Sequence, residues 1–304
     1  MHYLIAIKQN NWDSVLLPLD DNTLQLTIQV RVFLQKVEPT ERKEFVGLSC
    51  DGKGNVRDKS KGHMYVIDPW TMTDWQNFEN DFKKAILTHW DQQFDLVPNK
   101  PWYKSAKGLT AAKVTCGLSL EIVKTSPQNS HASLMIFNTR KIPKPFRSHV
   151  NPHVVPKQGF FNRSDVETEW LSWMPHIYRN ESAVTKINGV PHAVDYVRNT
   201  AAHEFGHILE LKHVAGHGNE MKDYGFENVD DADTAMGAGS RQSARFANPW
   251  SDRLMKHLIK QTPDDQKVSF VATLSTPQLL GYWDHGELLH VGGNLWMLKS
   301  LFGQ

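Results

Sequence analysis

The sequence has little cysteine, no long apolar run and no excess of charge of either sign. Its 304 residues include only two cysteines, Cys50 and Cys116, so disulfide bonds do not form the framework of the fold and we expect reduced thiols. No run of about 18 apolar residues is present, which argues against a membrane span. The 34 basic and 33 acidic residues give a net charge of +1, which argues against nucleic acid as a partner.

The first residues also lack the features of a secretory leader. The stretch "MHYLIAIKQNNWDS" has a short apolar run that Lys8 interrupts, without a basic start or a small-residue cleavage pattern. We therefore expect a protein that is cytoplasmic, or exported without a classical signal peptide. The hydrophobic content of 40% supports a sizeable core, in one large domain or two of ordinary size.

What the sequence does contain is a histidine motif, "HEFGHILELKH", at residues 203 to 213. His203 and His207 lie four residues apart, so on an α-helix their rings project from one face and can bind one metal ion together. Glu204 follows the first histidine, and from there its carboxylate can act as the general base of metal-assisted hydrolysis. By composition alone, such a His-Glu-x-x-His pattern arises in roughly one chain of this length in a hundred.

Two further features favour a metal site over a chance match. His213, six residues after His207, supplies a third histidine, and three protein ligands with one open position are typical of catalytic zinc. Downstream, "DADTAMGAG" at residues 231 to 239 places Met236 among small residues, a composition that favours a tight turn. A methionine at that point could form an apolar floor beneath the histidines.

In these two stretches the sequence resembles the metzincin zinc peptidases, whose signature is an extended histidine motif followed by a methionine-containing turn. The motif is most similar to that of the matrixin branch, and the resemblance covers roughly residues 195 to 260. It implies a zinc endopeptidase with these site residues: zinc ligands His203, His207 and His213, general base Glu204 and turn methionine Met236. It also implies an α+β fold. A twisted sheet with two long helices would form an upper subdomain, and the active-site helix, methionine turn and C-terminal helix a lower one.

The sequence departs from the metzincin pattern inside the histidine motif. The family has glycine three residues after the second histidine, where the chain turns, and this chain has Glu210. Glutamate in the left-handed conformation costs on the order of 1 kcal/mol more than glycine. If the helix continued instead, His213 would lie about 600° beyond His207 and point away from the metal. The third ligand would then come from elsewhere, and the candidates are Glu220, Asp223, Glu227, Asp230 and, as a weaker rival in a glycine-flanked loop, His217.

A second departure follows the methionine. Several metzincins have a tyrosine shortly after it, which helps to hold the transition-state oxyanion, whereas residues 237 to 241 here read Gly-Ala-Gly-Ser-Arg. Oxyanion stabilisation would therefore come from zinc, from backbone N–H groups or from a side chain such as Tyr224 or Arg241. Arg241 is more simply explained as a surface arginine.

Periodicity predicts the elements of the N-terminal half. Alternating apolar residues at 23 to 34 predict a half-buried strand, and the glycine-rich residues 47 to 62 predict a mobile loop. An apolar stripe from Trp75 to Phe94 predicts a helix that begins at Thr73 and stops before Pro98. That helix would pack on the sheet.

A β-hairpin is expected next, with "KVTCGLSLEIV" and "HASLMIFN" as its strands and "TSPQNS" as its turn. Residues 141 to 162 contain four prolines and are expected to be irregular. A short helix is expected from Ser164. An edge strand of the sheet would bind substrate by backbone pairing, although the sequence does not identify it.

The expected zinc helix begins at Asp195 or Asn199, and Asn248 with Pro249 predicts a later helix from about 249 to 261. The last forty residues resemble a small β addition. We therefore divide the chain into residues 1 to 213, a sheet and helix subdomain that ends in the zinc-binding helix, and residues 214 to 304, with the methionine turn, the later helix and the β addition.

The leading hypothesis is a zinc-dependent endopeptidase that hydrolyses a peptide or protein substrate, with zinc as cofactor and Glu204 as general base. The same machinery would serve a cell-wall peptide amidase. An effector toxin peptidase, exported by a dedicated machine and held in check by an inhibitor or immunity partner, also fits the missing leader. A catalytically inert, metal-bearing binding module is the alternative from another class. The presence of Glu204 argues against it, because a scaffold needs no acid beside its first ligand.

Overall fold

The structure is a computed structural model, and we describe the residues whose placement it defines: 5–45, 47–59, 62–100, 113–139, 148–172, 177–178, 184–216, 221–259, 268–293 and 295–302. Several expectations fall outside these residues. They concern residues 141 to 147 and two candidate ligands, His217 and Glu220.

The centre of the fold is a nine-stranded mixed sheet built around the long strand β3 (Thr23–Val37), whose alternating burial confirms the strand expected there. The path of the sheet is β11-β12-β10-β3-β9-β8-β17, and β2 and β1 extend it from β3. The bounds of these strands are β1 Ile5–Ile7, β2 Asp13–Pro18, β8 Phe94–Pro98, β9 Lys113–Val123, β10 Ala132–Phe137, β11 His149–Asn151, β12 Lys157–Asn162 and β17 Phe270–Leu274.

The expected hairpin between β9 and β10 is wrong, because β3 lies between the two strands and pairs parallel with both. Val123 at the end of β9 is level with Phe33 of β3, and Ala132 at the start of β10 is level with Val32. The chain therefore crosses β3 and continues in the same direction. Alternating burial predicts each strand, but it does not determine which strand lies beside it or in which direction that strand runs.

The expectation of irregular structure between residues 141 and 162 is wrong for β11 and β12. β12 pairs parallel with β10, and β11 pairs antiparallel with β12 at the edge of the sheet. Pro152 and Pro156 lie between the two strands, where the missing N–H of proline removes no hydrogen bond from the ladder.

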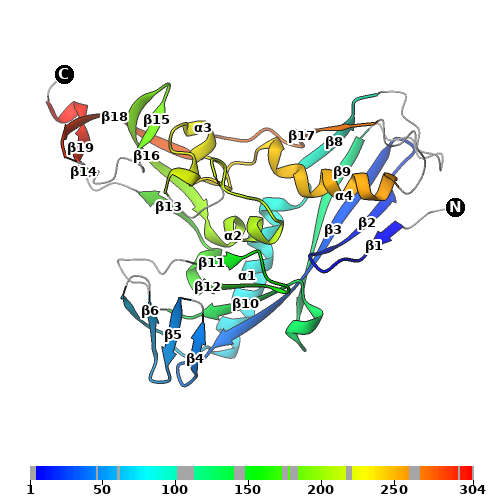
Figure 1. Ribbon diagram of the computed structural model, residues 1–304, viewed down its shortest axis with the longest axis horizontal. Coiled ribbons are helices and arrows are strands. Elements are labelled where there is room, and N and C mark those ends of the chain that lie inside the picture. The colour runs from blue at the N-terminus through cyan, green and yellow to red at the C-terminus, as the bar shows by residue number, and fades with distance from the viewer. Residues whose placement is uncertain are drawn as a thin grey trace.

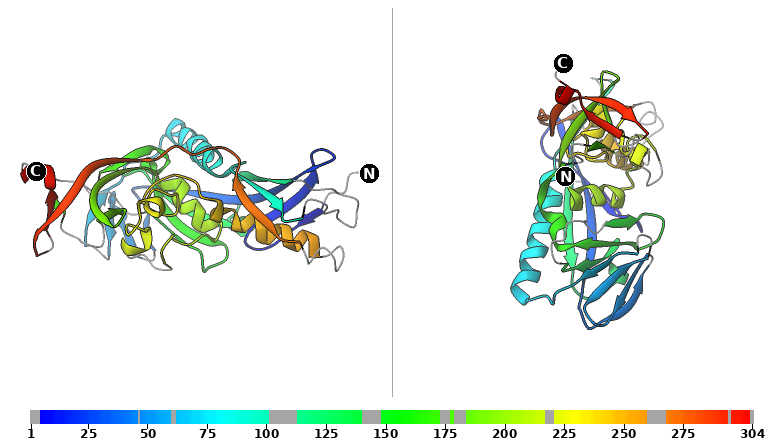
Figure 2. Two further views of the ribbon diagram at one scale, coloured as in Figure 1. Left: turned by 90° about the horizontal axis from the view of Figure 1, so that it is seen from above. Right: turned by 90° about the vertical axis from the view of Figure 1, so that its left-hand side faces the viewer.

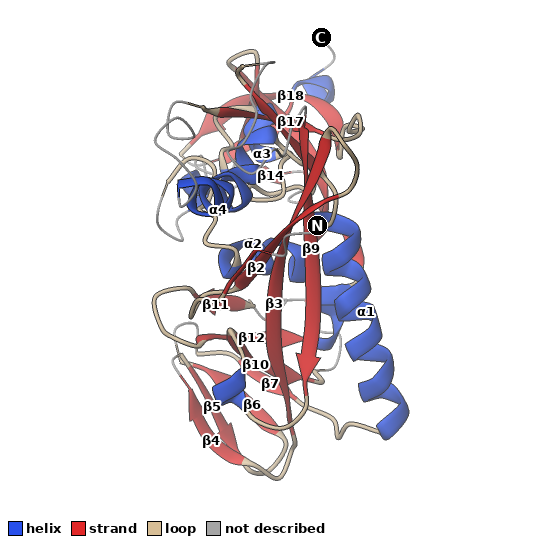
Figure 3. Ribbon diagram, turned by 90° about the vertical axis from the view of Figure 1, so that its right-hand side faces the viewer, coloured by secondary structure: helices blue, strands red, loops and turns tan. Residues whose placement is uncertain are grey.

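Helix α1 (Met72–Trp90) packs along one face of this sheet (Figure 3). The expected stripe is confirmed by its buried residues Phe78, Phe82, Ile86 and Trp90. The helix is shorter than expected because Phe94 already begins β8. It is capped by Thr71, whose side chain accepts a hydrogen bond from the Asp74 N–H, and not by the expected pair at residues 73 and 76.

A four-stranded antiparallel sheet replaces the loop expected at residues 47 to 62, and it lies at the lower left of Figure 1. Its strands, in the order of the sheet, are β4 Arg42–Phe45, β5 Leu48–Asp51, β6 Asn55–Asp58 and β7 Met64–Val66. Gly52 and Gly54 have positive φ angles of 71° and 87°. These glycines form a hairpin turn between β5 and β6, so the glycine-rich composition reflects a turn between strands and not a loop.

A third sheet has six strands in the path β13-β16-β18-β19-β14, with β15 beside β16. Its strands are β13 Thr168–Ser172, β14 Ile177–Tyr178, β15 Thr185–Ile187, β16 Val190–Asn199, β18 Tyr282–Gly292 and β19 Leu295–Leu298. The molecule is elongated, with β1 and β2 toward one end and β18 and β19 at the other (Figure 2). The short helix expected from Ser164 is a single 3-10 turn, Arg163–Val166, followed by β13.

The remaining α-helices are α2 (Thr200–Ile208), α3 (Val229–Ala232) and α4 (Asn248–Ile259). α2 begins directly after β16 with Asn199 as its N-cap, one of the two starts expected, and α4 confirms the later helix within two residues at its end. Further 3-10 turns lie at Pro127–Asn129, Met221–Tyr224, Ala244–Ala247 and Lys299–Phe302. The fold is thus mixed α+β with a sheet-rich core. Among the described residues, Cys50 and Cys116 are free and buried, and no helix has the length and apolarity to cross a membrane.

Candidate metal centre

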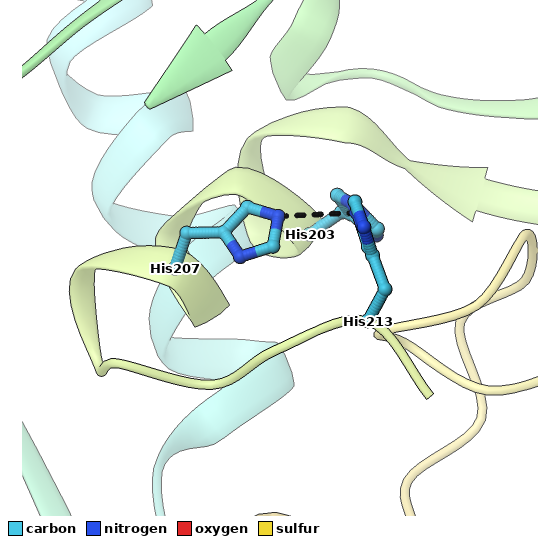
Figure 4. Close-up of side chains that lie close together, drawn as sticks. All are labelled: His203, His207 and His213. Atoms are coloured by element: carbon cyan, nitrogen blue, oxygen red, sulfur yellow. Dashed lines mark hydrogen bonds between the residues drawn. The ribbon is translucent and has the colours of Figure 1, made fainter. Parts of the chain in front are cut away.

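The three histidines of the motif come together in one group (Figure 4). His203 and His207 project from α2, and His213 approaches from the loop that follows it. The Nε2 atom of His213 lies 3.2 Å from Nε2 of His203 and 3.2 Å from Nε2 of His207. One ligand atom from each ring lies within 4.8 Å of the others, so the group can hold a metal ion.

The hydrogen bonds behind the rings prepare two of them to bind a cation. His203 Nδ1 lies 2.7 Å from the Ala235 carbonyl oxygen, and His207 Nδ1 lies 2.9 Å from that of Leu211. Because a carbonyl oxygen only accepts, both Nδ1 atoms carry the proton and both Nε2 lone pairs point inward. A proton on His213 Nε2 would satisfy only one of them, whereas a metal ion satisfies all three. A metal ion therefore satisfies the three nitrogen atoms better than hydrogen bonds among the rings do.

Burial keeps the first histidine neutral. His203 is 1% exposed, and burial lowers its pKa well below the usual value, with a further lowering by the Arg198 charge. A neutral imidazole is the form that binds a metal.

The loop to the third histidine turns at Glu210, as the metzincin pattern requires of a glycine. α2 ends at Ile208, and Glu210 has a φ angle of +67°. The N–H of Leu211 donates to the Gly206 carbonyl oxygen at 2.9 Å, which closes the turn. The alternative in which the helix continues and carries His213 away from the site is therefore wrong.

Among the described residues, no carboxylate joins the histidine group. Glu227 pairs with Lys186, and Asp230 pairs with Arg241. Asp223 is buried beside Gly216, and no metal-ligand group includes it.

The methionine turn lies directly beneath α2. Met236 is fully buried, and a Cβ atom built on Gly206 would come within 2.3 Å of its sulfur atom. Trp90 of α1 closes the same space and donates from Nε1 to the Ala202 carbonyl oxygen at 2.9 Å. Gly206 is thus needed for close approach, since any side chain there would separate the helix from the turn.

Glu204 faces the edge strand β11. Its side chain is buried, and Oε2 accepts a hydrogen bond from the Val150 N–H at 3.1 Å. β11 pairs with β12 on its other side, and among the described strands none pairs with it on this side, so this N–H lies at the edge of the sheet. Sequence reasoning missed Val150, because the contact joins residues 54 positions apart and leaves no local signal.

A second, partly buried carboxylate supports the same strand. Asp165 accepts hydrogen bonds from the Ser148 hydroxyl, just before β11, and from the Asn162 N–H at 2.6 Å. Burial raises the pKa of Asp165 to about 7; the two hydrogen bonds oppose the rise, and the nearby Glu204 charge adds to it.

A cleft of about 570 Å³ runs beside the metal ligands and is lined by His149, Val150, Asn151, Pro152, His153, His207, Glu210, Leu211, Lys212 and His213. It therefore extends from β11 to His207 and His213. A neighbouring hollow of about 450 Å³ shares His149 and Asn151 with it, and its apolar walls are Phe45, Met135 and Phe160.

Of the two side chains considered for oxyanion stabilisation, one lies at the metal site and the other does not. The ring of Tyr224 packs on His213, with centroids 4.4 Å apart, and on His203 at 5.7 Å. Arg241 is bound to the carboxylates of Asp230 and Asp233. The sequence favoured a surface arginine, whereas the side chain is 22% exposed and pairs with both carboxylates.

Comparison with known proteins gave no match to a protein-family model, to a curated protein or to a solved structure.

Proposed function

We propose that the protein is a zinc-dependent endopeptidase of the metzincin type. The observation that carries the proposal is the convergence of three histidine Nε2 atoms beside a buried glutamate that faces the edge strand β11. Two features of the fold support it. The sheet has parallel strands with an antiparallel edge strand next to α2, and a buried methionine lies under the metal-binding helix.

His203, His207 and His213 would hold the zinc ion. The ion would supply Lewis acidity, which activates water and polarises a peptide carbonyl group. Glu204 would accept a proton from the attacking water at a carboxylate oxygen and deliver it to the nitrogen of the leaving amine. The Val150 N–H orients this carboxylate through Oε2. Of the two side chains considered for the oxyanion, Tyr224 is the one whose ring packs on a metal ligand.

The substrate would be an extended peptide that adds a strand to β11. The edge of a strand can bind a peptide through backbone hydrogen bonds. The Val150 N–H on this edge already donates to Glu204, so the peptide would pair with the other backbone groups of the edge. Substrate side chains that point toward His149 and Asn151 would enter the hollow walled by Phe45, Met135 and Phe160. We therefore expect a preference for a large apolar side chain at one position of the substrate.

Metal content and hydrolysis, measured on the same preparations, test the proposal. Wild type should hold about one zinc per chain by mass spectrometry and cleave a broad peptide library. His213→Ala should lose zinc, whereas His153→Ala, an exposed cleft histidine outside the ligand group, should keep it. Glu204→Gln should keep zinc and lose at least a hundredfold in rate, because it cannot take the proton.

Two outcomes would overturn the proposal. Full zinc retention by His213→Ala would remove the three-histidine site. Zinc-loaded wild type as inert as Glu204→Gln would favour the binding module. If peptides from a cell wall were cleaved and unmodified proteins were not, the amidase would be the better description. If cells that express the wild type grew slowly and cells that express Glu204→Gln grew normally, the effector toxin would be favoured.

A further inference from the structure

We propose that Glu210 is a positioning residue, which holds the loop of the third metal ligand in place through an ion pair with the buried Lys157. The inference rests on the proposed metal site, and it goes beyond it by assigning a role to the residue that breaks the metzincin pattern. Glu210 touches neither the reacting atoms nor the metal ligands in this role. It acts on the backbone between two of them.

The ion pair joins three distant parts of the chain. Oε1 of Glu210 lies 3.3 Å from Nζ of Lys157, which is the first residue of β12. The same oxygen accepts a hydrogen bond from Nδ2 of Asn11, just before β2. The loop after α2 is therefore fastened to the main sheet and to the N-terminal segment through one carboxylate.

Lys157 needs this partner because its side chain is only 2% exposed. A buried ammonium group without a counter-charge is strongly unfavourable. Burial lowers the pKa of Lys157, and the charge and hydrogen bond of Glu210 oppose that lowering. Among the described residues, no other acidic group forms an ion pair with Lys157.

The position of Glu210 makes the tether relevant to the metal. It lies three residues after His207 and three before His213. The adjacent Leu211 presents the carbonyl oxygen that accepts from His207 Nδ1 at 2.9 Å. A shift of this loop would therefore move His213 and also release the ring of His207.

Glycine and glutamate have different advantages at this turn, one for the backbone conformation and the other for the charge of Lys157. Glycine adopts a φ angle of +67° without strain, whereas glutamate does so at a cost. Only glutamate can neutralise Lys157. If Glu210 only adds backbone strain to the turn, Glu210→Gly should tighten zinc binding. If Glu210 fixes the loop, the same substitution should weaken zinc binding, and the two views thus predict opposite signs.

The test is the zinc dissociation constant, measured by competition with a chromophoric chelator. We expect Glu210→Gly, Glu210→Gln and Lys157→Met each to weaken zinc binding by about tenfold. The double variant Glu210→Gln with Lys157→Met should be about as weak as either single variant, since both remove one interaction. Lys212→Met, which removes an exposed lysine from the same loop, should bind zinc like the wild type.

Thermal unfolding of the metal-free proteins separates positioning from folding. The double variant contains no buried unpaired charge, so it should unfold within a few degrees of the wild type and still bind zinc more weakly. Zinc binding by Glu210→Gly that equals or exceeds that of wild type would overturn the inference. The inference would also be overturned if the double variant bound zinc about a hundredfold more weakly than the wild type, since the two substitutions would then act independently. If the wild type bound no zinc, the metal site itself would be wrong, which is a different result.

Discussion

Replacement of Gly206 by alanine tests the packing of the metal-binding helix on the methionine turn. The new Cβ atom would lie 2.3 Å from Met236 Sδ and 3.1 Å from Trp90 Cζ2. Met236 and Trp90 are both fully buried, so neither can move into solvent. Overpacking of this severity costs about 3 kcal/mol, and the better helix propensity of alanine offsets about 1 kcal/mol. We therefore expect the free energy of unfolding to fall by about 2 kcal/mol.

Urea denaturation followed by circular dichroism measures this change, and the Met236→Ala background provides the control. Met236→Ala alone should cost about 2–5 kcal/mol, because it leaves a cavity under α2. In that background the contact with Met236 is gone, and the cavity lets Trp90 yield by the few tenths of an ångström that its 3.1 Å contact requires, so alanine at position 206 should stabilise the protein by about 1 kcal/mol. The reasoning would be refuted if Gly206→Ala stabilised the protein in both backgrounds, since Met236 would then not constrain the helix.

Three further predictions concern other residues that support the site. Asp165→Asn should change the pH dependence of unfolding. Because burial raises the pKa of Asp165 to about 7, the wild type loses up to about 4 kcal/mol relative to the variant as the pH rises from 4 through 7. Trp90→Phe should lower the free energy of unfolding by about 1–2 kcal/mol, because it removes the hydrogen bond to the Ala202 carbonyl oxygen. Phe45→Ala should reduce cleavage of substrates with a large apolar side chain by about tenfold and leave other substrates unaffected, because Phe45 walls the hollow beside β11.

Each of these predictions has an outcome that contradicts it. Parallel stability curves for wild type and Asp165→Asn between pH 4 and pH 8 would show that this carboxyl group titrates normally. Unchanged unfolding of Trp90→Phe would mean that the hydrogen bond adds nothing beyond ring packing. Equal losses on all substrates for Phe45→Ala would indicate damage to the cleft and not a change of preference.

Local sequence patterns were sufficient for α2, which carries two of the ligands, and for several elements around it. The alternation in β3, the apolar stripe of α1, the Asn199 cap of α2 and the Asn-Pro start of α4 each depend on residues close together in the chain. The histidine spacing indicated the ligand group for the same reason, since two of its members are one helical turn apart.

Long-range contacts could not be predicted in this way. The contact between Val150 and Glu204 and the ion pair between Lys157 and Glu210 each join separate elements, so neither produces a periodicity. The sequence raised the question of Glu210 without answering it, because the strain of its turn was visible and the compensating charge was not. The parallel pairing of β9 and β10 with β3 was missed because alternation is the same in parallel and antiparallel neighbours.

No linker separates β16 from α2, so the third sheet is directly connected to the helix that carries two of the metal ligands. Asn199 is both the last residue of β16 and the cap of the helix that carries two ligands. β16 is held on one side by β13 and on the other by β18, which comes from the far end of the chain. Because no flexible segment separates β16 from α2, a change in the twist of that sheet would also change the orientation of α2 and of the histidine rings on it. Residues close to the C-terminus therefore help to set the orientation of ligands that they never touch.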